Sequence, residues 1–144
     1  MRVCLDTNVL VAAFATRGLC TDILRECLSE HALVIGEFHL EELRRVLRKK
    51  LRLSDDRVEA AVAVFDDIDI VPRPEAALSI SIRDPDDKWI LATAVAGNAE
   101  ILVTGDDDLL SVAADCPISI VTPRAFWQSL RSDGENASVH FLAG

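Results

Sequence analysis

The sequence VCLDTN, from Val3 to Asn8, places an acid, a hydroxyl and an amide directly after a short apolar run. The apolar half predicts a buried strand, and the apolar run that follows, from Val9 to Ala15, predicts a helix. Strands that end in polar side chains and turn at once into a helix commonly supply ligand-binding groups in α/β proteins. A buried strand gains nothing from an unpaired acid at its end, so Asp6 predicts partners elsewhere in the chain.

The rest of the chain alternates short apolar runs with amphipathic stretches. The apolar runs predict strands at Val3–Leu5, Leu33–Ile35, Ile68–Val71, Ile101–Thr104 and Ile118–Val121. Helical patterns occur at Asn8–Ala15, Thr21–Ser29, Phe38–Leu51, Ser54–Phe65, Asp86–Gly97 and Pro123–Leu130. This alternation predicts an α/β fold, a three-layer α/β/α domain with a mainly parallel sheet of about five strands. We expect the domain to span residues 1–131 and a flexible tail to span residues 132–144.

Several of the expected helices have recognisable end signals. Asp84 and Thr122 each precede a proline, and Ser54 precedes two acids, so all three predict helix N-caps. Gly97-Asn98 predicts the end of the helix before the fourth expected strand.

Composition limits the class of protein. The chain has 144 residues, of which half are hydrophobic and 27% are charged, as in an ordinary globular domain. No segment reaches the roughly 18 apolar residues of a transmembrane helix, and Asp6 interrupts the N-terminal apolar run too early for a signal peptide. The four cysteines lack metal-ligand spacing and predict free thiols. We therefore expect a cytoplasmic protein without a membrane anchor.

Charge is unevenly distributed along the chain. The net charge of −9 by itself argues against a polyanionic partner. Six of the fifteen basic residues, however, lie between Arg44 and Arg52, whereas acids cluster at Asp66-Asp67, Asp84 to Asp87 and Asp106 to Asp108. An acidic average with one basic helix is compatible with a metal-dependent enzyme that acts on nucleic acid.

Three acids are expected near one edge of the sheet. The carboxyl ends of parallel strands share an edge, where ligand crevices form. Asp6 follows the first expected strand, and Asp106 follows the fourth, past a turn at Gly105. Asp87 opens the helix that precedes the fourth strand, so its distance from the edge depends on how that helix packs.

A fourth acid lies on the basic helix. A helical wheel places Glu42 at the border of the apolar stripe, from which its side chain can reach a cleft. Arg45 and Lys49 lie on the same side and are candidates for contacts with nucleic-acid phosphates, whereas Arg44 and Arg48 fit a solvated face. Taken alone, Glu42 could simply pair with Arg45 three residues on, and Asp6 could simply cap a helix.

Carboxylates gathered in one crevice repel one another and raise each other's pKa unless a cation compensates. Mg²⁺ and Mn²⁺ take oxygen ligands of this kind and keep waters for substrate phosphates. Such a site can activate water and stabilise the transition state of phosphoryl transfer, with one metal ion or with two.

Four segments carry a shared pattern, in this order: LDTNVL (5–10), ELRRVL (42–47), DPDDKWILA (84–92) and LVTGD (102–106). With them the chain resembles the PIN-domain family, and more specifically the toxin-type (VapC-like) ribonucleases of bacterial and archaeal toxin–antitoxin pairs. The resemblance extends over residues 3–126. Four ordered segments at fitting spacing are far more specific than the short D-T-N motif alone.

The resemblance implies four catalytic acids that also bind the metal: Asp6, Glu42, Asp87 and Asp106. It implies that Thr7, Asn8 and Thr104 orient an acid or a metal-bound water. Asp108 is a further candidate for this supporting role, and Asp86 is an alternative to Asp87.

The implied activity is Mg²⁺- or Mn²⁺-dependent hydrolysis of single-stranded RNA by an endoribonuclease. Arg45 and Lys49 would then contact RNA phosphates. The resemblance further implies that the protein is the toxin of a type II toxin–antitoxin pair, held inactive by a cognate antitoxin, and that it forms a homodimer.

Two other classes of function remain open. One is a catalytically silent PIN scaffold that binds RNA or a protein partner. The other is an aspartate-nucleophile phosphatase, which would need a second acid two residues after Asp6, where Asn8 stands. A receiver-like phosphoacceptor would need a lysine late in the chain, and no lysine follows Lys88.

Overall fold

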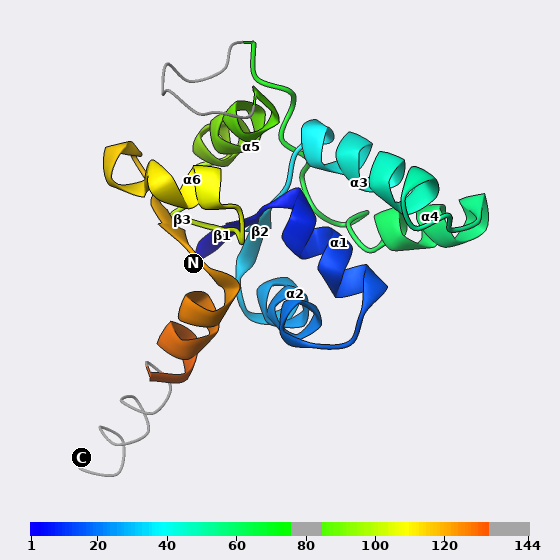
Figure 1. Ribbon diagram of the computed structural model, residues 1–144, viewed down its shortest axis with the longest axis horizontal. Coiled ribbons are helices and arrows are strands. Elements are labelled where there is room, and N and C mark those ends of the chain that lie inside the picture. Colours follow the sequence, from blue (N-terminus) through cyan, green and yellow to red (C-terminus); the bar gives the residue numbers. More distant parts are fainter. Residues whose placement is uncertain (76–84, 133–144) are drawn as a thin grey trace.

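The protein is described by a computed structural model over residues 1–75 and 85–132. In this part of the chain one sheet contains four parallel strands: β1 (Arg2–Leu5), β2 (Ala32–Val34), β3 (Ile101–Val103) and β4 (Ser119–Val121). Their order is β2-β1-β3-β4. In the register of the sheet Cys4 pairs with Val34 on one side and with Leu102 on the other. Because all pairs are parallel, the strands end at one edge (Figure 1).

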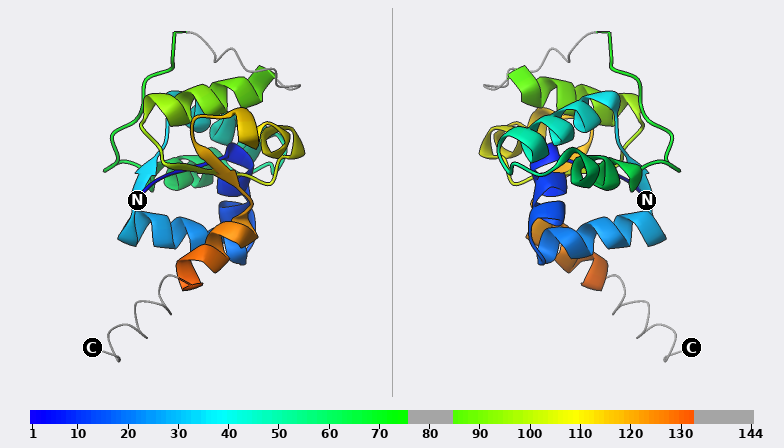
Figure 2. Two further views of the ribbon diagram at one scale, coloured as in Figure 1. Left: turned by 90° about the vertical axis from the view of Figure 1, so that its left-hand side faces the viewer. Right: turned by 90° about the vertical axis from the view of Figure 1, so that its right-hand side faces the viewer.

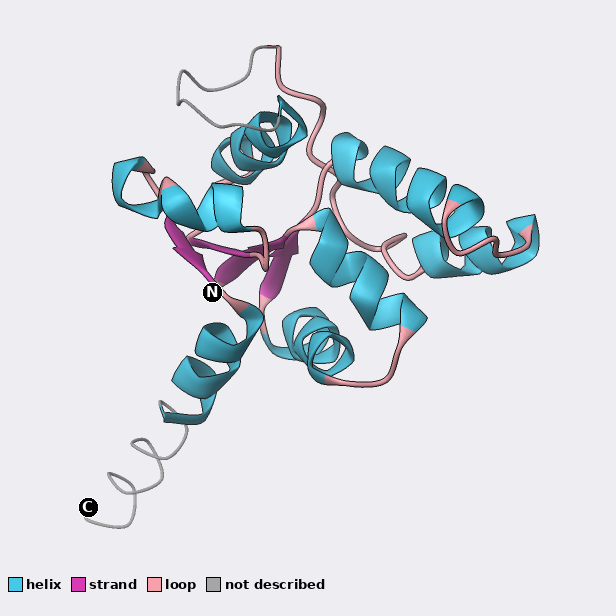
Figure 3. Ribbon diagram, in the orientation of Figure 1, coloured by secondary structure: helices cyan, strands magenta, loops and turns pink. Residues whose placement is uncertain are grey.

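Helices connect the strands and surround the sheet (Figure 3). In chain order they are α1 (Thr7–Ala15), α2 (Leu19–Glu30), α3 (Glu37–Lys49), α4 (Asp55–Ala63), α5 (Pro85–Ala96) and α6 (Asp107–Ser111). A 3-10 turn, η1 (Ala113–Asp115), follows α6, and a last helix covers residues 123–132. The sequence pattern predicts all of these elements except α6 and η1. None of the described helices is long and apolar enough to cross a membrane.

The side chains of the central strand alternate between two apolar cores. Val3 and Leu5 pack into one core together with Ile23 of α2. Cys4 packs into the opposite core together with Leu91 of α5. Side views accordingly show α2 and α5 on opposite sides of the sheet (Figure 2). The expected three-layer α/β/α architecture is therefore confirmed.

The expected strand at Ile68–Val71 is wrong. Among the described residues of this segment only Val71 pairs with the rest of the sheet region, through an isolated parallel bridge to Gly36. Its N–H donates to the Ile35 carbonyl at 2.9 Å, and its carbonyl accepts from the Glu37 N–H at 3.0 Å. Ile68 instead closes a turn after α4 and packs against the core. The alternating pattern thus reflects burial of one face without a hydrogen-bonded ladder, and the sheet has four strands rather than about five.

Two of the expected N-caps are confirmed. The Ser54 hydroxyl accepts from the Arg57 N–H at 3.4 Å, and the Thr122 hydroxyl accepts from the Ala125 N–H at 3.1 Å. The expected cap at Asp84 lies outside the described residues, as does the expected tail beyond residue 132.

The end of α5 lies at the expected dipeptide, but the two residues act differently. Asn98, with φ of 57°, takes the left-handed conformation. Gly97 instead allows close packing, because a Cβ there would clash with the side chain of Val34 and lie 2.9 Å from that of Val71. Position 97 therefore requires glycine because there is no room for a side chain, not because of its backbone angles.

A buried histidine fixes the start of α3 against the central strand. His39 is fully buried, and its Nδ1 accepts a hydrogen bond from the Gly36 N–H at 3.2 Å. Because Nδ1 accepts, the neutral ring carries its proton on Nε2, which lies 3.5 Å from Cys4 Sγ. Burial lowers the pKa of His39 from 6.5 to about 4, although a hydrogen bond with the backbone of Leu5 opposes this. The ring is therefore structural and neutral.

We expect His39 to make the protein less stable in weak acid. Between the lowered pKa of about 4 and the ordinary value of 6.5, the unfolded chain binds a proton that the folded chain excludes. The contribution of neutral His39 to the free energy of unfolding is thus fully present above pH 6.5. The free energy of unfolding falls by about 3 kcal/mol as the pH approaches 4. Urea unfolding of His39→Asn, whose amide oxygen can still accept from Gly36, should show a correspondingly weaker pH dependence. Identical pH dependence in the two proteins would contradict this assignment.

Candidate active site

The first acid of the site stands where β1 passes into α1. The Asp6 N–H donates to the Val103 carbonyl at 2.9 Å, which extends the pairing of β1 with β3 by one residue. Its own carbonyl accepts the N–H groups of Val9 and Leu10 and so begins the helix. The Asp6 side chain is buried, with 3% of the residue exposed, and makes no capping hydrogen bond to α1. The simple cap interpretation of Asp6 therefore does not account for its carboxylate.

Thr104 connects this acid to the next strand end. Its fully buried hydroxyl donates to Asp6 Oδ2 at 2.7 Å and accepts from the Asp106 N–H at 3.0 Å. Asp106 in turn caps α6, because its Oδ1 accepts from the Asp108 N–H at 2.8 Å. One chain of hydrogen bonds thus sets the relative positions of the ends of β1 and β3 and the start of α6.

Three carboxylates lie close together at this edge. Oxygen atoms of Asp87, Asp106 and Asp108 all lie within 4.8 Å of one another. Asp87 reaches them from the first turn of α5 and is buried, with 6% exposed. Asp108 is the least expected member, since the family resemblance makes it only a candidate for a supporting role. The short helix α6 is what turns its side chain toward Asp106.

Glu42 faces these acids from α3. It lines a pocket of about 210 Å³ whose described lining comprises Asp6, Thr7, Asn8, Glu42, Arg45, Val46, Lys50, Asp86, Asp87, Ile90 and Asp106. The four acids named from the family pattern therefore share one pocket, and the pocket contains more acidic than basic side chains.

The electrostatic environment of Glu42 reflects this crowding. Burial raises the pKa of Glu42, and the nearby carboxylates of Asp86 and Asp6 raise it further. The Thr7 hydroxyl and the Arg45 guanidinium act in the opposite direction. Arg45 Nη2 lies 3.7 Å from Glu42 Oε1, so the expected i,i+3 pair is present, but the glutamate also belongs to the pocket.

Neighbouring residues of the motifs differ in burial. Asp87 is buried in the acid cluster, whereas Asp86 is exposed and lines the pocket nearer to Glu42. Thr7 is buried beside Glu42, whereas Asn8 is exposed at the pocket lining.

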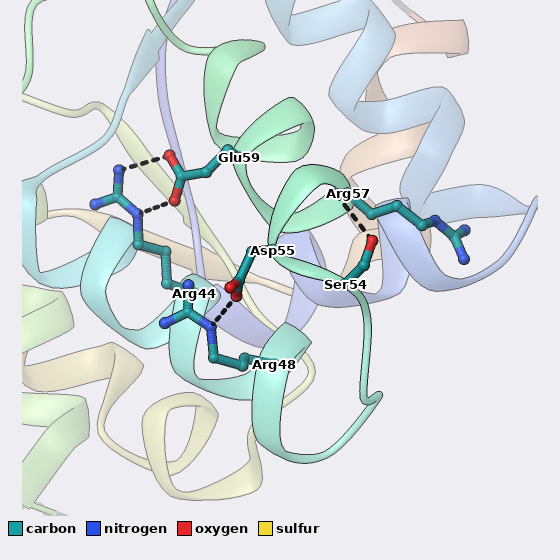
Figure 4. Close-up of polar contacts among 6 residues, drawn as sticks. All are labelled: Arg44, Arg48, Ser54, Asp55, Arg57 and Glu59. Carbon is teal, nitrogen blue, oxygen red and sulfur yellow. Dashed lines mark hydrogen bonds and ion pairs between the residues drawn. The ribbon is translucent and has the colours of Figure 1, made fainter.

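The basic helix divides into two faces. Arg44 pairs with Glu59 at 3.2 Å and Arg48 with Asp55 at 3.0 Å, so both tie α3 to α4 (Figure 4). Arg45 lines the acidic pocket. Lys49 is exposed and lies outside the described pocket lining, which instead contains Lys50.

Lys50 is the site residue that the helical wheel misses. It stands eight residues after Glu42 and four after Val46, and these three form one row along α3. The spacing i, i+4, i+8 from a candidate ligand is the signal that points to it. A helical wheel places Lys50 near the apolar stripe of α3, which would predict a position facing the core. Leu47 is the last buried residue of this stripe, however, and beyond it the same side of the helix lines the pocket.

The model of the family described as "PIN domain" matches residues 2–108. The chain belongs to the PIN-domain family. The match includes all four acids and both strand ends that carry them. No curated protein sequence matches this PIN domain.

Solved structures share the fold at low sequence identity. The domain is similar to VapBC2 from Rickettsia felis, in a structure bound to a DNA fragment from their promoter, with 18% identity and a TM-score of 0.59. It is also similar to VapBC-1 from nontypeable Haemophilus influenzae, with 16% identity and a TM-score of 0.59. The alignments cover 85% and 86% of this chain and 98% and 99% of those chains. These likenesses confirm the fold.

The donor set of this PIN domain fits a hard divalent cation. Asp87, Asp106 and Asp108 offer carboxylate oxygens within 4.8 Å of one another, and Asp6 and Glu42 line the adjoining pocket. Mg²⁺ and Mn²⁺ bind such all-oxygen sets and keep several waters. No histidine or cysteine belongs to this described cluster, so a site for zinc of the usual nitrogen and sulfur type is not indicated there.

Proposed function

We propose that this PIN domain is an endoribonuclease that hydrolyses single-stranded RNA with the help of Mg²⁺ or Mn²⁺. The observation that carries the proposal is the convergence of Asp6, Glu42, Asp87 and Asp106 on one pocket at the carboxyl edge of the sheet. Like charges at this density are unfavourable without a cation. The intact acid set favours a nuclease over a silent scaffold, and Asn8 at the second position disfavours the phosphatase.

Each residue has a proposed role in the hydrolysis. Asp87, Asp106 and Asp108 would hold the metal together with Asp6, and Glu42 would complete the acidic pocket. A bound divalent ion supplies an acidified water and charge stabilisation at the phosphate. In the hydrolysis a water oxygen would form the new bond to phosphorus while a pocket carboxylate takes the water's proton. The bond to the leaving ribose oxygen would break, and that oxygen would take up a proton from solvent. Glu42 suits the proton transfer, because burial and the neighbouring carboxylates raise its pKa.

Supporting residues would orient these groups. Thr104 holds the Asp6 carboxylate through a 2.7 Å hydrogen bond, and Thr7 lies beside Glu42. Asn8 lines the pocket and can contact a water or a phosphate oxygen. Arg45, about half exposed at the pocket, is the candidate for a contact to the scissile phosphate.

We further propose that the protein is the toxin of a type II toxin–antitoxin pair. The support is the fold shared with two VapBC structures over nearly the full length of those chains. A cognate antitoxin would then hold the nuclease inactive in the cytoplasm, and a homodimer is expected from the same resemblance.

Metal removal tests the proposed activity directly. Purified protein incubated with labelled single-stranded RNA should cleave it with Mn²⁺ or Mg²⁺ and should stop when EDTA is added. RNA cleavage at the same rate in EDTA would contradict the proposal, since the pocket acids alone repel the phosphate. RNA binding without cleavage under all metal conditions would favour the scaffold.

A further inference from the structure

A second hollow adjoins the acidic pocket. It has a volume of about 430 Å³, and its described lining comprises Phe38, Glu41, Glu42, Arg45, Arg73 and Asp86. Glu42, Arg45 and Asp86 line both hollows. The two hollows therefore adjoin at these three residues along α3, and the acids Asp6, Asp87 and Asp106 line only the hollow that also contains Lys50.

Arg73 is held firmly in the second hollow. Its guanidinium carbon lies 5.3 Å from the ring centre of Phe38 and 5.0 Å from that of Trp89. Its Nη1 pairs with Glu41 at 3.3 Å, and its backbone N–H donates to Glu37 at 3.2 Å. The side chain nevertheless stays 45% exposed. An arginine whose face contacts aromatic rings keeps N–H groups at its edge for a phosphate.

Lys50 stands at the opposite end of α3, in the lining of the acidic pocket. The helical conformation of α3 extends to this residue, because its N–H donates to the Val46 carbonyl at 2.9 Å and its backbone angles are helical. Eight residues of helix separate Lys50 from Glu42, which corresponds to about 12 Å along the axis. Arg73, in contrast, lies against Phe38 and Glu41 in the first turns of the same helix.

Cations thus flank the acidic pocket along one line. We propose that the RNA strand lies along α3, with Arg73 and Lys50 binding phosphates on opposite sides of the scissile bond. This inference rests on the proposed ribonuclease function. A pocket with an excess of carboxylates repels the backbone of its own substrate, so phosphate-binding groups are needed at its rim or beside it. Lys50 lines the acidic hollow and Arg73 lines the adjoining one, and the residues shared by the two hollows lie between them along α3.

The aromatic residues support phosphate binding rather than base stacking at this end. Trp89 and Phe38 are both in contact with the Arg73 guanidinium. The two rings thus position the Arg73 guanidinium, and this guanidinium, rather than a ring, would contact the RNA strand. Recognition by charge along the backbone is tolerant of base sequence.

The test compares matched charge removals. Arg73→Gln and Lys50→Gln are measured beside Arg44→Gln and Arg48→Gln. Arg44 is a suitable control because it is 40% exposed and paired with Glu59, much as Arg73 is 45% exposed and paired with Glu41. Arg48 is the second control, because it is 49% exposed, paired with Asp55 and outside the described lining of both hollows. Each substitution removes one positive charge, so general attraction to RNA changes equally in all four.

The readouts are RNA affinity and cleavage kinetics with a short labelled single-stranded RNA. Arg73→Gln and Lys50→Gln should each lower the slope of log affinity against log salt concentration by about 0.7, the value for one lost phosphate contact. KM should rise about tenfold, with kcat changed less than about twofold, because the contacts are made in both ground and transition states. The two control variants should keep the wild-type slope and KM.

Folding is monitored separately, because Arg73 also packs on two rings. Arg73→Lys keeps the charge but loses the planar contact with the rings. Its dependence of RNA affinity on salt should therefore match that of the wild type, whereas its melting temperature should be lowered as in Arg73→Gln. If wild-type protein cleaves RNA and all four variants share one slope and one KM, the strand path is refuted and the nuclease stands. The path would also be refuted if the folded variants keep full RNA affinity, as expected of a groove for a protein partner. If wild-type protein neither binds nor cleaves RNA with Mn²⁺, the nuclease itself fails.

Discussion

Asp6→Asn is expected to lower the rate of RNA cleavage by about 100-fold or more, since loss of groups that merely support metal ligands already reduces activity by about 10- to 100-fold. The amide has the size of the carboxylate and can still accept the Thr104 hydroxyl, which now lies 2.7 Å from Asp6 Oδ2. Only the negative charge is lost. Initial rates with Mn²⁺ and a labelled RNA measure the effect.

A metal-free melting experiment distinguishes lost chemistry from lost folding. In EDTA, Asp6→Asn should melt at the wild-type temperature or above it, because the substitution removes one buried charge from a pocket of like charges. Wild-type protein should become more stable on addition of Mn²⁺, by the linkage of binding to folding, and the variant should gain much less. Thr104→Val, which keeps all carboxylates, should show an intermediate loss of about tenfold. Wild-type cleavage by Asp6→Asn would refute the proposed metal site.

Asp87→Asn and its neighbour Asp86→Asn should differ strongly in activity. Asp87 is buried and within 4.8 Å of Asp106 and Asp108, so its substitution should reduce cleavage by about 100-fold or more. Asp86 is exposed on the pocket lining near Glu42, and its substitution should change cleavage by less than about tenfold. The two variants carry the same charge change one residue apart, so each controls for the other.

The metal dependence of the two variants adds a second measure. Asp87→Asn should need a higher Mn²⁺ concentration for half-maximal activity, whereas Asp86→Asn should keep the wild-type requirement. If Asp86→Asn instead lost more activity and needed more Mn²⁺ than Asp87→Asn, the ligand role would belong to Asp86. The helix α5 would then have to be rotated by one residue relative to β3.

The parts of the fold that follow from local pattern were predictable. The strand ends at Asp6 and Asp106 follow from apolar runs that stop at a polar residue, and parallel pairing then brings both to one edge. Glu42 follows from helical periodicity, and the caps at Ser54 and Thr122 from side-chain chemistry. Each of these inferences needs only a few adjacent residues.

The parts that depend on tertiary packing were not predictable in this way. Ile68 and Ile70 alternate as in a strand, but packing on the core satisfies them without a ladder. The helix α6 is five residues long, and its acids resemble those of an ordinary turn. That helix is what brings Asp108 to Asp87, so the motifs suggest only a supporting role for this third member of the cluster.

Arg73 shows the same limit more strongly. Nothing in its local sequence distinguishes it from a surface arginine. Its position depends on Phe38 from α3 and Trp89 from α5, which the fold brings together around it. Lys50 is intermediate, since the i, i+4, i+8 spacing points to it once the pocket lining is known.

The hydrogen bond between Thr104 and Asp6 joins residues 98 positions apart in the chain. A polypeptide still under synthesis therefore contains Asp6 and Glu42 long before it contains the strand that completes the pocket. If the domain is a nuclease as proposed, its acids cannot share one pocket until β3 has been synthesised and paired with β1. Cleavage of the chain anywhere between these two strands, followed by separation of the fragments, would likewise leave two inert pieces. The order of the elements along the chain would thus set the point at which the proposed activity can begin.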